Sequence, residues 1–177
     1  MAALAVAFSL AAVAAHACDT RPVAQQAAAF DSCGTPWTFV LANADEDVYL
    51  CDQGDCPPNT VLRFNVSAMD EDDRALDREE LLDEWTGRQV PETMGSFAIE
   101  MLEPIGIETI AGTEGIVIPL RLTDNDDDSQ FVSVAFRIVR ETDYVIANVT
   151  GEADLPEVRA LLDQVVAQLS LPEDPQP

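Results

Sequence analysis

Two side chains on which enzymes often depend are missing or nearly missing from this 177-residue sequence. It contains no lysine, so all nine basic residues are arginine, and its only histidine is His16. Histidine-based nucleophilic catalysis, zinc held by histidine, Schiff-base chemistry on lysine and P-loop phosphate binding all need one of these side chains. The sequence therefore excludes these chemistries for any form of the protein that begins after His16.

Positive charge is also scarce. The chain has 33 acidic residues against nine arginines, for a formal net charge of −24 at pH 7. Nucleic acids and anionic lipid surfaces bind proteins that present clusters of lysine or arginine, so we expect neither as a partner. Solubility is the simplest explanation of the acidic surface, and attraction of a basic partner or of divalent cations is the functional alternative.

The N-terminus has the pattern of an export signal. Residues 1–17 form an alanine-rich apolar run without acidic residues that ends in the A-x-A sequence Ala15-His16-Ala17. We therefore predict a signal peptide that is cleaved after Ala17, and a protein that is periplasmic or secreted by a bacterium. The run is shorter than the roughly 18 to 25 apolar residues of a transmembrane helix, so we expect no transmembrane segment.

After this cleavage Cys18 would be the first residue, which raises the question of a lipid anchor. A bacterial lipidation signal has a bulky aliphatic residue three positions before the cysteine, and this sequence has Ala15 there, followed by His16. We therefore expect no lipid anchor at Cys18. The remaining length suits a single domain over residues 18–171, with a proline-rich flexible tail at 172–177.

Four cysteines follow the predicted signal peptide: Cys18, Cys33, Cys51 and Cys56. An even number of cysteines in an exported protein points to disulfides, here two. Three pairings are possible, and we favour Cys51 with Cys56 and Cys18 with Cys33. Gly54 supports the short pairing because glycine lets the backbone turn back within the segment CDQGDC.

The segment CDQGDC has two other interpretations, a thiol redox centre or half of a metal site. Redox centres usually have two residues between the cysteines, and this segment has four. Asp52 and Asp55 would also raise the pKa of a neighbouring thiol, because a thiolate is disfavoured beside carboxylates. We therefore interpret the segment as a disulfide-closed loop, which contributes about 2 kcal/mol to stability by the chain-entropy estimate.

The acidic run DNDDDS at 124–129 invites a calcium interpretation. Asp124, Asp126 and Asp128 occupy the first, third and fifth positions of an EF-hand-like loop. However, Ser129 replaces the glycine of the sharp turn, and the twelfth position is not a glutamate. We favour a hairpin loop with solvated carboxylates and keep a weak calcium site as the alternative. We expect no other metal and no cofactor.

Apolar periodicity predicts strands with two well-capped helices. Asp77 begins one helix and Gly87 ends it, while Asp154 begins the closing helix with Glu157 completing a capping box. Pro119 within one strand predicts a sheet edge or a bulge. The predicted helices are 22–30, the helix from Asp77 and the helix from Asp154, and the predicted strands are 37–41, 48–51, 60–68, 97–102, 105–111, 115–122, 130–140 and 143–150.

These elements define the fold class. The closing helix has an apolar stripe that must be buried, and a face of the sheet is the available surface. We therefore predict a single α+β domain with a central antiparallel sheet flanked by helices. The stripe consists of Leu155, Val158, Leu161, Leu162, Val165, Val166 and Leu169.

The order of strands, helix, antiparallel strands and closing helix resembles the PsbP-like family, named for the photosystem II extrinsic protein. The matching segments are TVLRFNVS and the stretch from FAIEM to VRALLDQVVAQLSL, about two thirds of the chain after residue 17. The resemblance is one of layout without a shared motif. It implies an α/β/α sandwich and an accessory or binding role, and it transfers no functional residue.

Our first hypothesis for function is therefore an exported, non-catalytic binding or accessory protein braced by two disulfides. Its partner would be a protein or small ligand of the bacterial envelope. The alternative is a thiol-redox enzyme or a carboxylate-based hydrolase of the envelope. With 33 acidic residues, the sequence nominates no particular catalytic pair.

Overall fold

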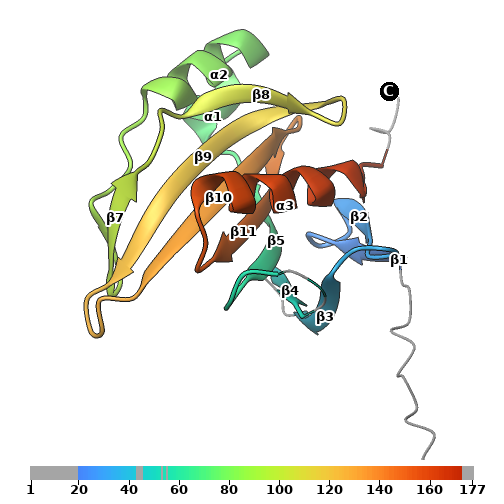
Figure 1. The fold of residues 1–177 in the computed structure, drawn as a ribbon. Helices are drawn as coiled ribbons and strands as arrows, with labels where there is room; N and C mark the ends of the chain where they lie inside the picture. Colours follow the sequence, from blue (N-terminus) through green and yellow to red (C-terminus); the bar gives the residue numbers. More distant parts are fainter. Residues whose placement is uncertain (1–19, 43–45, 53, 55, 173–177) are drawn as a thin grey trace, which may run out of the picture.

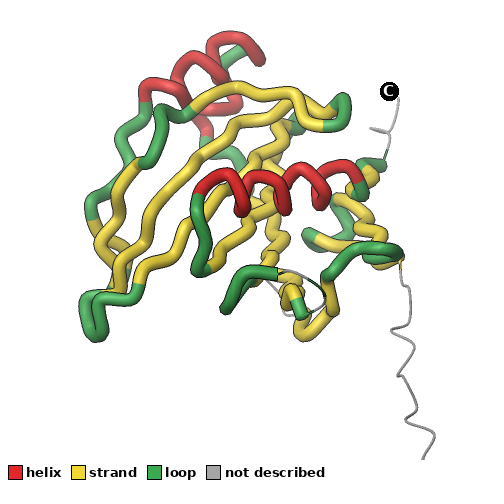
Figure 2. Tube along the Cα trace, in the orientation of Figure 1, coloured by secondary structure: helices red, strands yellow, loops and turns green. Residues whose placement is uncertain are grey.

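The computed structural model describes residues 20–42, 46–52, 54 and 56–172, and strands dominate it (Figure 2). The predicted signal peptide, Cys18 and residues 173–177 lie outside the described residues. The main antiparallel sheet has the order β3 (Trp37–Ala42), β4 (Glu46–Cys51), β5 (Val61–Ala68), β11 (Asp143–Gly151), β10 (Gln130–Val139), β9 (Thr113–Asp124), β7 (Phe97–Met101) and β6 (Thr93–Met94), with β8 (Gly106–Ile110) also paired to β9.

A second, three-stranded sheet replaces the helix predicted over 22–30. It consists of β1 (Thr20–Val23), β2 (Ala28–Asp31) and β12 (Leu169–Ser170). Ala24, Gln25 and Gln26 all have positive φ, so they form a turn that a right-handed helix cannot contain. The helix prediction was wrong because the helix propensity of alanine is weaker than the burial of alternate side chains, among them Phe30, in the core.

Helix α3 (Leu155–Ala167) lies across β10 and β11 (Figure 1). Its predicted capping box is confirmed, since Asp154 accepts from the backbone N–H of Glu157 and the Glu157 carboxylate accepts from the N–H of Asp154. The apolar side of α3 and the small sheet pack on the same face of the main sheet and form the larger core. Its buried helical residues are Val158, Leu162, Val165 and Val166.

The opposite face of the main sheet carries α1 (Glu71–Ala75) and α2 (Arg78–Gly87), which lie at one end of it (Figure 1). The predicted capping box of Asp77 and Glu80 is confirmed. A smaller apolar cluster joins α2 to the strands beneath it. Helices therefore lie on both sides of the sheet, but they are few and short, and the fold is a sheet-dominated α+β domain.

Pro119 lies neither at a sheet edge nor at a bulge, because β9 pairs with β10 on one side and with β7 and β8 on the other. The β7 pairing covers 120–124 and the β8 pairing covers 113–117, so Pro119 falls between them. Its carbonyl accepts from the N–H of Leu102 on this outer side. The proline nitrogen faces the same side, so its missing N–H removes no ladder hydrogen bond. The other predicted strands are confirmed, with small shifts at their ends.

Candidate functional site

A part of the main sheet remains uncovered on the side opposite α3, beyond α1 and α2. Cross-strand partners point to the same side of a sheet, so the strand registers define this surface as three rows running from β9 to β4. We call these rows the open face. They are Ile116, Arg137, Ile146, Asn65 and Glu46; then Ile118, Ala135, Asn148, Arg63 and Val48; and finally Leu120, Ser133, Thr150, Val61 and Leu50. The three isoleucines are buried in the apolar cluster beneath α2 and Ser133 is buried as well, whereas the other members are partly or fully exposed.

The charge of the open face is opposite to that of the chain. Its three rows contain two arginines and a single carboxylate, Glu46, which forms an ion pair with Arg63 at 3.5 Å. The whole chain has 33 acidic residues against nine arginines. A surface without free carboxylates in such an acidic protein can approach an anion without close-range repulsion.

Arg137 is the second arginine of the open face, and it has no acidic partner. Its guanidinium lies over the ring of Trp85, with Cζ 4.4 Å from the ring centroid. Nε is buried without a hydrogen-bond partner. The terminal Nη atoms make no hydrogen bond to the described part of the chain and are not among its buried unpaired atoms, so they are not completely buried. Burial lowers the pKa of Arg137. Tyr144 and the carboxylate of Asp73 partly offset this, and the neighbouring charge of Arg88 adds to it.

Most other arginines of the described chain are paired with carboxylates. Arg74 is also without a carboxylate partner, but it is exposed on α1, where water solvates its charge. Arg137 is half-buried, so less water is available to it. The arginines with carboxylate partners are Arg63, Arg78, Arg88, Arg121, Arg140 and Arg159.

A hydrogen-bond network holds Trp85 beside Arg137. The indole Nε1 of Trp85 donates to the hydroxyl of Tyr144 at 3.0 Å, and this hydroxyl donates to Asp73 at 2.6 Å. Asp73, only 3% exposed, also forms an ion pair with Arg88. Burial, together with the hydrogen bond to Asp73, raises the pKa of Tyr144 to about 12. Both carboxylate oxygens of Asp73 thus already have partners within the network, and Asp73 forms no ion pair with Arg137.

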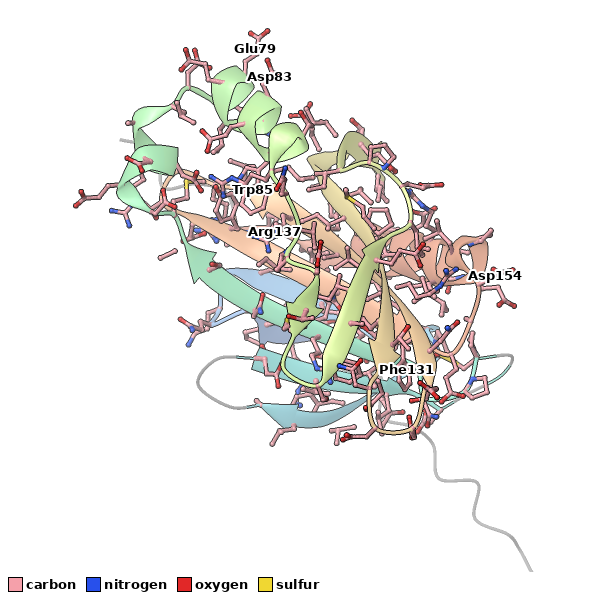
Figure 3. All side chains as sticks on the ribbon, turned by 90° about the vertical axis from the view of Figure 1, so that its left-hand side faces the viewer. Glu79, Asp83, Trp85, Phe131, Arg137 and Asp154 are labelled. Carbon is pink, nitrogen blue, oxygen red and sulfur yellow. A yellow bond between two sulfur atoms is a disulfide. The ribbon has the colours of Figure 1, made fainter. Side chains whose placement is uncertain are left out.

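Figure 3 shows Trp85 and Arg137 from the side. Trp85 lies on the side of α2 that faces the strands, next to Arg137, whereas Glu79 and Asp83 point away from the sheet into solvent. These two acidic residues are therefore directed away from Arg137, and Glu80 is held in the capping box with Asp77. Glu84 pairs with Arg88 at 3.0 Å.

A polar ladder continues the open face beyond Arg137. Asn148 Nδ2 donates to Ser133 Oγ at 3.1 Å, and Thr150 Oγ1 donates to Asn148 Oδ1 at 2.8 Å. Asn148 and Thr150 remain partly exposed, while Ser133 is only 4% exposed. On the β9 side these residues are flanked by Leu120. The surface next to Arg137 therefore has one hydrogen-bonding side and one apolar side.

A pocket of about 350 Å³ lies elsewhere, around the start of α3. Its charged groups are already used within the protein. Arg121 pairs with Glu100 at 2.9 Å, Glu103 pairs with Arg159 at 2.6 Å, and Asp154 caps α3. In contrast to the open face, this pocket offers a ligand no unpaired charged donor from the described residues that line it.

The predicted disulfide between Cys51 and Cys56 is confirmed, with a Cα–Cα distance of 5.8 Å. It closes a turn between β4 and β5, and Cys51 is the last residue of a strand rather than the first of a helix. A helix dipole therefore does not activate this thiol. Cys33 is disulfide-bonded as well, but its predicted partner Cys18 lies outside the described residues. The Cys18–Cys33 pairing stays a prediction.

Asp124, Asp126 and Asp128 lie at the loop that joins β9 to β10, as the hairpin prediction requires. Asp124 Oδ1 accepts from the N–H of Asp126 at 2.9 Å, so this carboxylate supports the turn itself. Across the described ranges, no group of three His, Cys, Asp or Glu residues is arranged to hold a metal ion. The weak calcium site stays a prediction. Nor does any helix in the described segments have the length and apolar character needed to cross a membrane.

Comparison with models of known protein families finds no match, and neither does comparison with curated protein sequences. Comparison with solved structures finds cyanobacterial PsbP (CyanoP) from Synechocystis sp. PCC 6803, at 12% sequence identity and a TM-score of 0.57. The similarity covers 92% of this chain and 97% of that chain. The chain has a PsbP-like fold.

A sequence identity of 12% supports a shared fold and no more. The predicted resemblance to the PsbP-like family is therefore confirmed for the fold alone. A looser similarity is to a protein of unknown function from Pseudomonas aeruginosa, PA94, described as a putative regulator. It is 15% identical, with a TM-score of 0.39, and the match covers 80% of this chain and 98% of that one.

The sequence did not indicate Arg137 as a site residue, nor the network of Asp73, Trp85 and Tyr144 beside it. Alternation along 130–140 places Arg137 on the polar side of its strand, where an arginine is ordinarily solvated. One signal was available, because β10 contains no acidic residue in a chain with 33 of them. Whether another strand or helix supplies a carboxylate depends on tertiary contacts that periodicity does not contain.

Proposed function

We propose that this protein is an exported, non-catalytic binding or accessory module, braced by disulfides, whose ligand sits on the open face. The observation that carries the proposal is Arg137, a half-buried cation without an acidic partner on a surface with a single, already paired carboxylate. A charged group that is partly removed from water without compensation destabilises the fold unless a ligand or partner neutralises it.

Export is supported by two independent features. The apolar run and A-x-A pattern of residues 1–17 favour cleavage after Ala17 and delivery to the periplasm or the medium of a bacterium. The Cys51–Cys56 disulfide suits an oxidising compartment. The binding partner is then a small ligand or a protein of the bacterial envelope.

The side chains after residue 17 favour binding over catalysis. They include no histidine or lysine. The buried carboxylate of Asp73 is held by Arg88 and the Tyr144 hydroxyl, which leaves it unavailable as a general base. Cys51 and Cys56 are joined in a disulfide at the end of a strand. A binding role also agrees with what the PsbP-like resemblance implies.

The test has two parts. First, intact mass of the exported protein should show a chain that begins at Cys18 and contains no free thiol. Second, ¹⁵N-labelled protein should be titrated with a chemically diverse fragment library, including neutral, anionic and cationic compounds. We expect the amide shifts caused by binding fragments to cluster on β10, β11 and β5, around the open face.

Two results would contradict the proposal. One is a fragment set that binds only around the start of α3, where the 350 Å³ pocket lies, and leaves the open face unperturbed. The other is efficient hydrolytic or thiol-exchange turnover by the purified protein, which would favour the enzyme alternative.

A further inference from the structure

We infer that the ligand of the open face is a small organic monocarboxylate, held through its carboxylate by the terminal nitrogens of Arg137. This inference rests on the proposed binding function and names its ligand class. It follows from three features of the described residues: the geometry of the guanidinium, the local charge balance and the composition of the surface that leads away from it.

The geometry leaves one edge of the guanidinium available. The Cζ atom of Arg137 lies over the Trp85 ring, 4.4 Å from its centroid, and Nε is buried. The two Nη atoms are not completely buried and lie in one plane. This edge matches the two oxygens of a carboxylate, which arginine binds through paired N–H···O hydrogen bonds. The contact with the indole also restricts the rotation of the guanidinium, so less side-chain entropy is lost on binding.

The local charge balance favours a single negative charge on the ligand. Arg88 forms ion pairs with both Asp73 and Glu84, and the three groups together carry a charge of −1. Among the described residues, Arg137 is the one cation beside this group that forms no ion pair, so it can pair with one negative charge on a ligand. A monoanion therefore pairs with one cation, whereas a phosphate dianion would add two charges to a site that has one unpaired donor group and a chain of net charge −24.

No protein carboxylate on the open face competes for Arg137. The single acidic residue of the rows, Glu46, lies three strands away on β4 and is paired with Arg63. With neighbouring strands about 4.8 Å apart, this is about 14 Å, beyond the screening length of about 8 Å at physiological ionic strength. The carboxylate position next to Arg137 is thus left to a ligand.

The surface beyond Arg137 indicates the size and polarity of the rest of the ligand. Along β10 the next side chains on the open face are Ala135 and Ser133, both small. Leu120 flanks them on β9, and Asn148 and Thr150 flank them on β11. This strip is about 13 Å long at about 3.3 Å per residue. It suits a body of one ring or a short chain with one apolar edge and one hydrogen-bonding edge.

The inference is tested by NMR titration in 150 mM NaCl with three probes that share a phenyl ring: benzoate, neutral benzamide of the same shape, and phenyl phosphate. The indole N–H of Trp85 and the Nε–H of Arg137 report directly on the site. We expect benzoate to bind at least tenfold more tightly than benzamide and more tightly than phenyl phosphate, because only benzoate presents a planar monoanionic carboxylate.

Two variants with the same charge change make the test specific. Arg137→Gln should weaken benzoate binding at least tenfold. Arg121→Gln, on the opposite face and at the lining of the α3 pocket, should change it less than twofold. If Arg137→Gln does not fold, Arg137→Lys keeps the charge without the paired donors and should weaken binding to an intermediate degree.

The outcomes separate the ligand class from the function. Equal binding of benzoate and benzamide on the open face, or tighter binding of phenyl phosphate, would overturn the monocarboxylate and leave the binding module intact. Loss of benzoate binding in Arg121→Gln but not in Arg137→Gln would place the ligand in the other pocket and overturn the inference. The absence of any perturbation on the open face by any fragment would overturn both proposals.

Discussion

The hydroxyl of Tyr144 is a single oxygen atom on which the attachment of α1 and α2 to the sheet depends. It donates to the buried carboxylate of Asp73 at 2.6 Å and accepts from the indole of Trp85 at 3.0 Å. The substitution Tyr144→Phe removes this atom and leaves the ring, which packs in the smaller apolar cluster. Two buried polar groups then each lose a partner.

The cost can be worked from these two contacts. A hydrogen bond to a charged group contributes about 1.5 to 3 kcal/mol, and a neutral one about 0.5 to 1.5 kcal/mol. Asp73 keeps its ion pair with Arg88, which limits the penalty for the carboxylate. We therefore expect Tyr144→Phe to lower the free energy of unfolding by about 2 to 4 kcal/mol, a large fraction of the roughly 5 to 15 kcal/mol of a typical domain.

The assay is urea-induced unfolding of the oxidised protein at pH 7, followed by tryptophan fluorescence and far-UV circular dichroism. Tyr144→Phe, Asp73→Ala and the double variant form a thermodynamic cycle, in which the two changes should be coupled because each removes the same contact. A loss below about 0.5 kcal/mol, or a coupling energy near zero, would refute the reasoning, because ordinary surface changes have effects of that size.

The pH dependence of stability gives an independent check on Tyr144. Its pKa in the folded protein, about 12, lies above the value of 10.0 for an ordinary tyrosine. Below pH 10 both states keep the proton, so the stabilisation is fully present. As the pH rises above 10 the unfolded chain loses its proton first, and stability falls until about pH 12. Between pH 9 and pH 11 the wild type should lose about 1 kcal/mol more than Tyr144→Phe.

Four further predictions concern other parts of the chain. Gly115→Ala should destabilise the protein by about 2 to 3 kcal/mol in urea unfolding, because the new Cβ would lie 2.6 Å from a buried phenylalanine ring, whereas Gly87→Ala meets no atom within 4 Å and should be neutral or stabilising. Replacing Cys51 and Cys56 by serine should lower the unfolding free energy by about 2 kcal/mol, and a loss below about 0.5 kcal/mol would contradict the stabilising role of this disulfide. Calorimetry should detect at most weak, millimolar calcium binding at the β9–β10 loop, and its loss on mutating the three aspartates would locate it there. Mass spectrometry of the exported protein should show cleavage after Ala17 without added lipid mass; a retained N-terminus would contradict the signal peptide.

Much of the secondary structure could be predicted because it depends on local features. The capping boxes at Asp77 and Asp154 need residues only three positions apart, and the strand alternation of 130–140 and 143–150 needs only neighbours in sequence. The Cys51–Cys56 disulfide joins residues five positions apart. For the segment 22–30 local features gave the wrong prediction. Its alanines favour a helix locally, but its burial against the main sheet favours strands.

The candidate site depended on contacts between distant segments. Arg137 faces Trp85 and Tyr144, and the Tyr144 hydroxyl meets Asp73, 71 positions away. Whether an arginine has an acidic partner depends on which strands and helices are brought beside it, and strand periodicity shows only the side of the sheet on which it lies.

The amino-acid sequence by itself determined which chemistries are excluded, the export pattern, the capped helices and the strands that build the sheet, because each follows from composition or from residues close together in the chain. Only the tertiary structure decided that residues 20–31 form a hairpin, that Pro119 falls between two outer strands, and that Arg137 is left without a carboxylate. Burial and charge pairing are non-local: they arise when the strand registers bring distant side chains into contact.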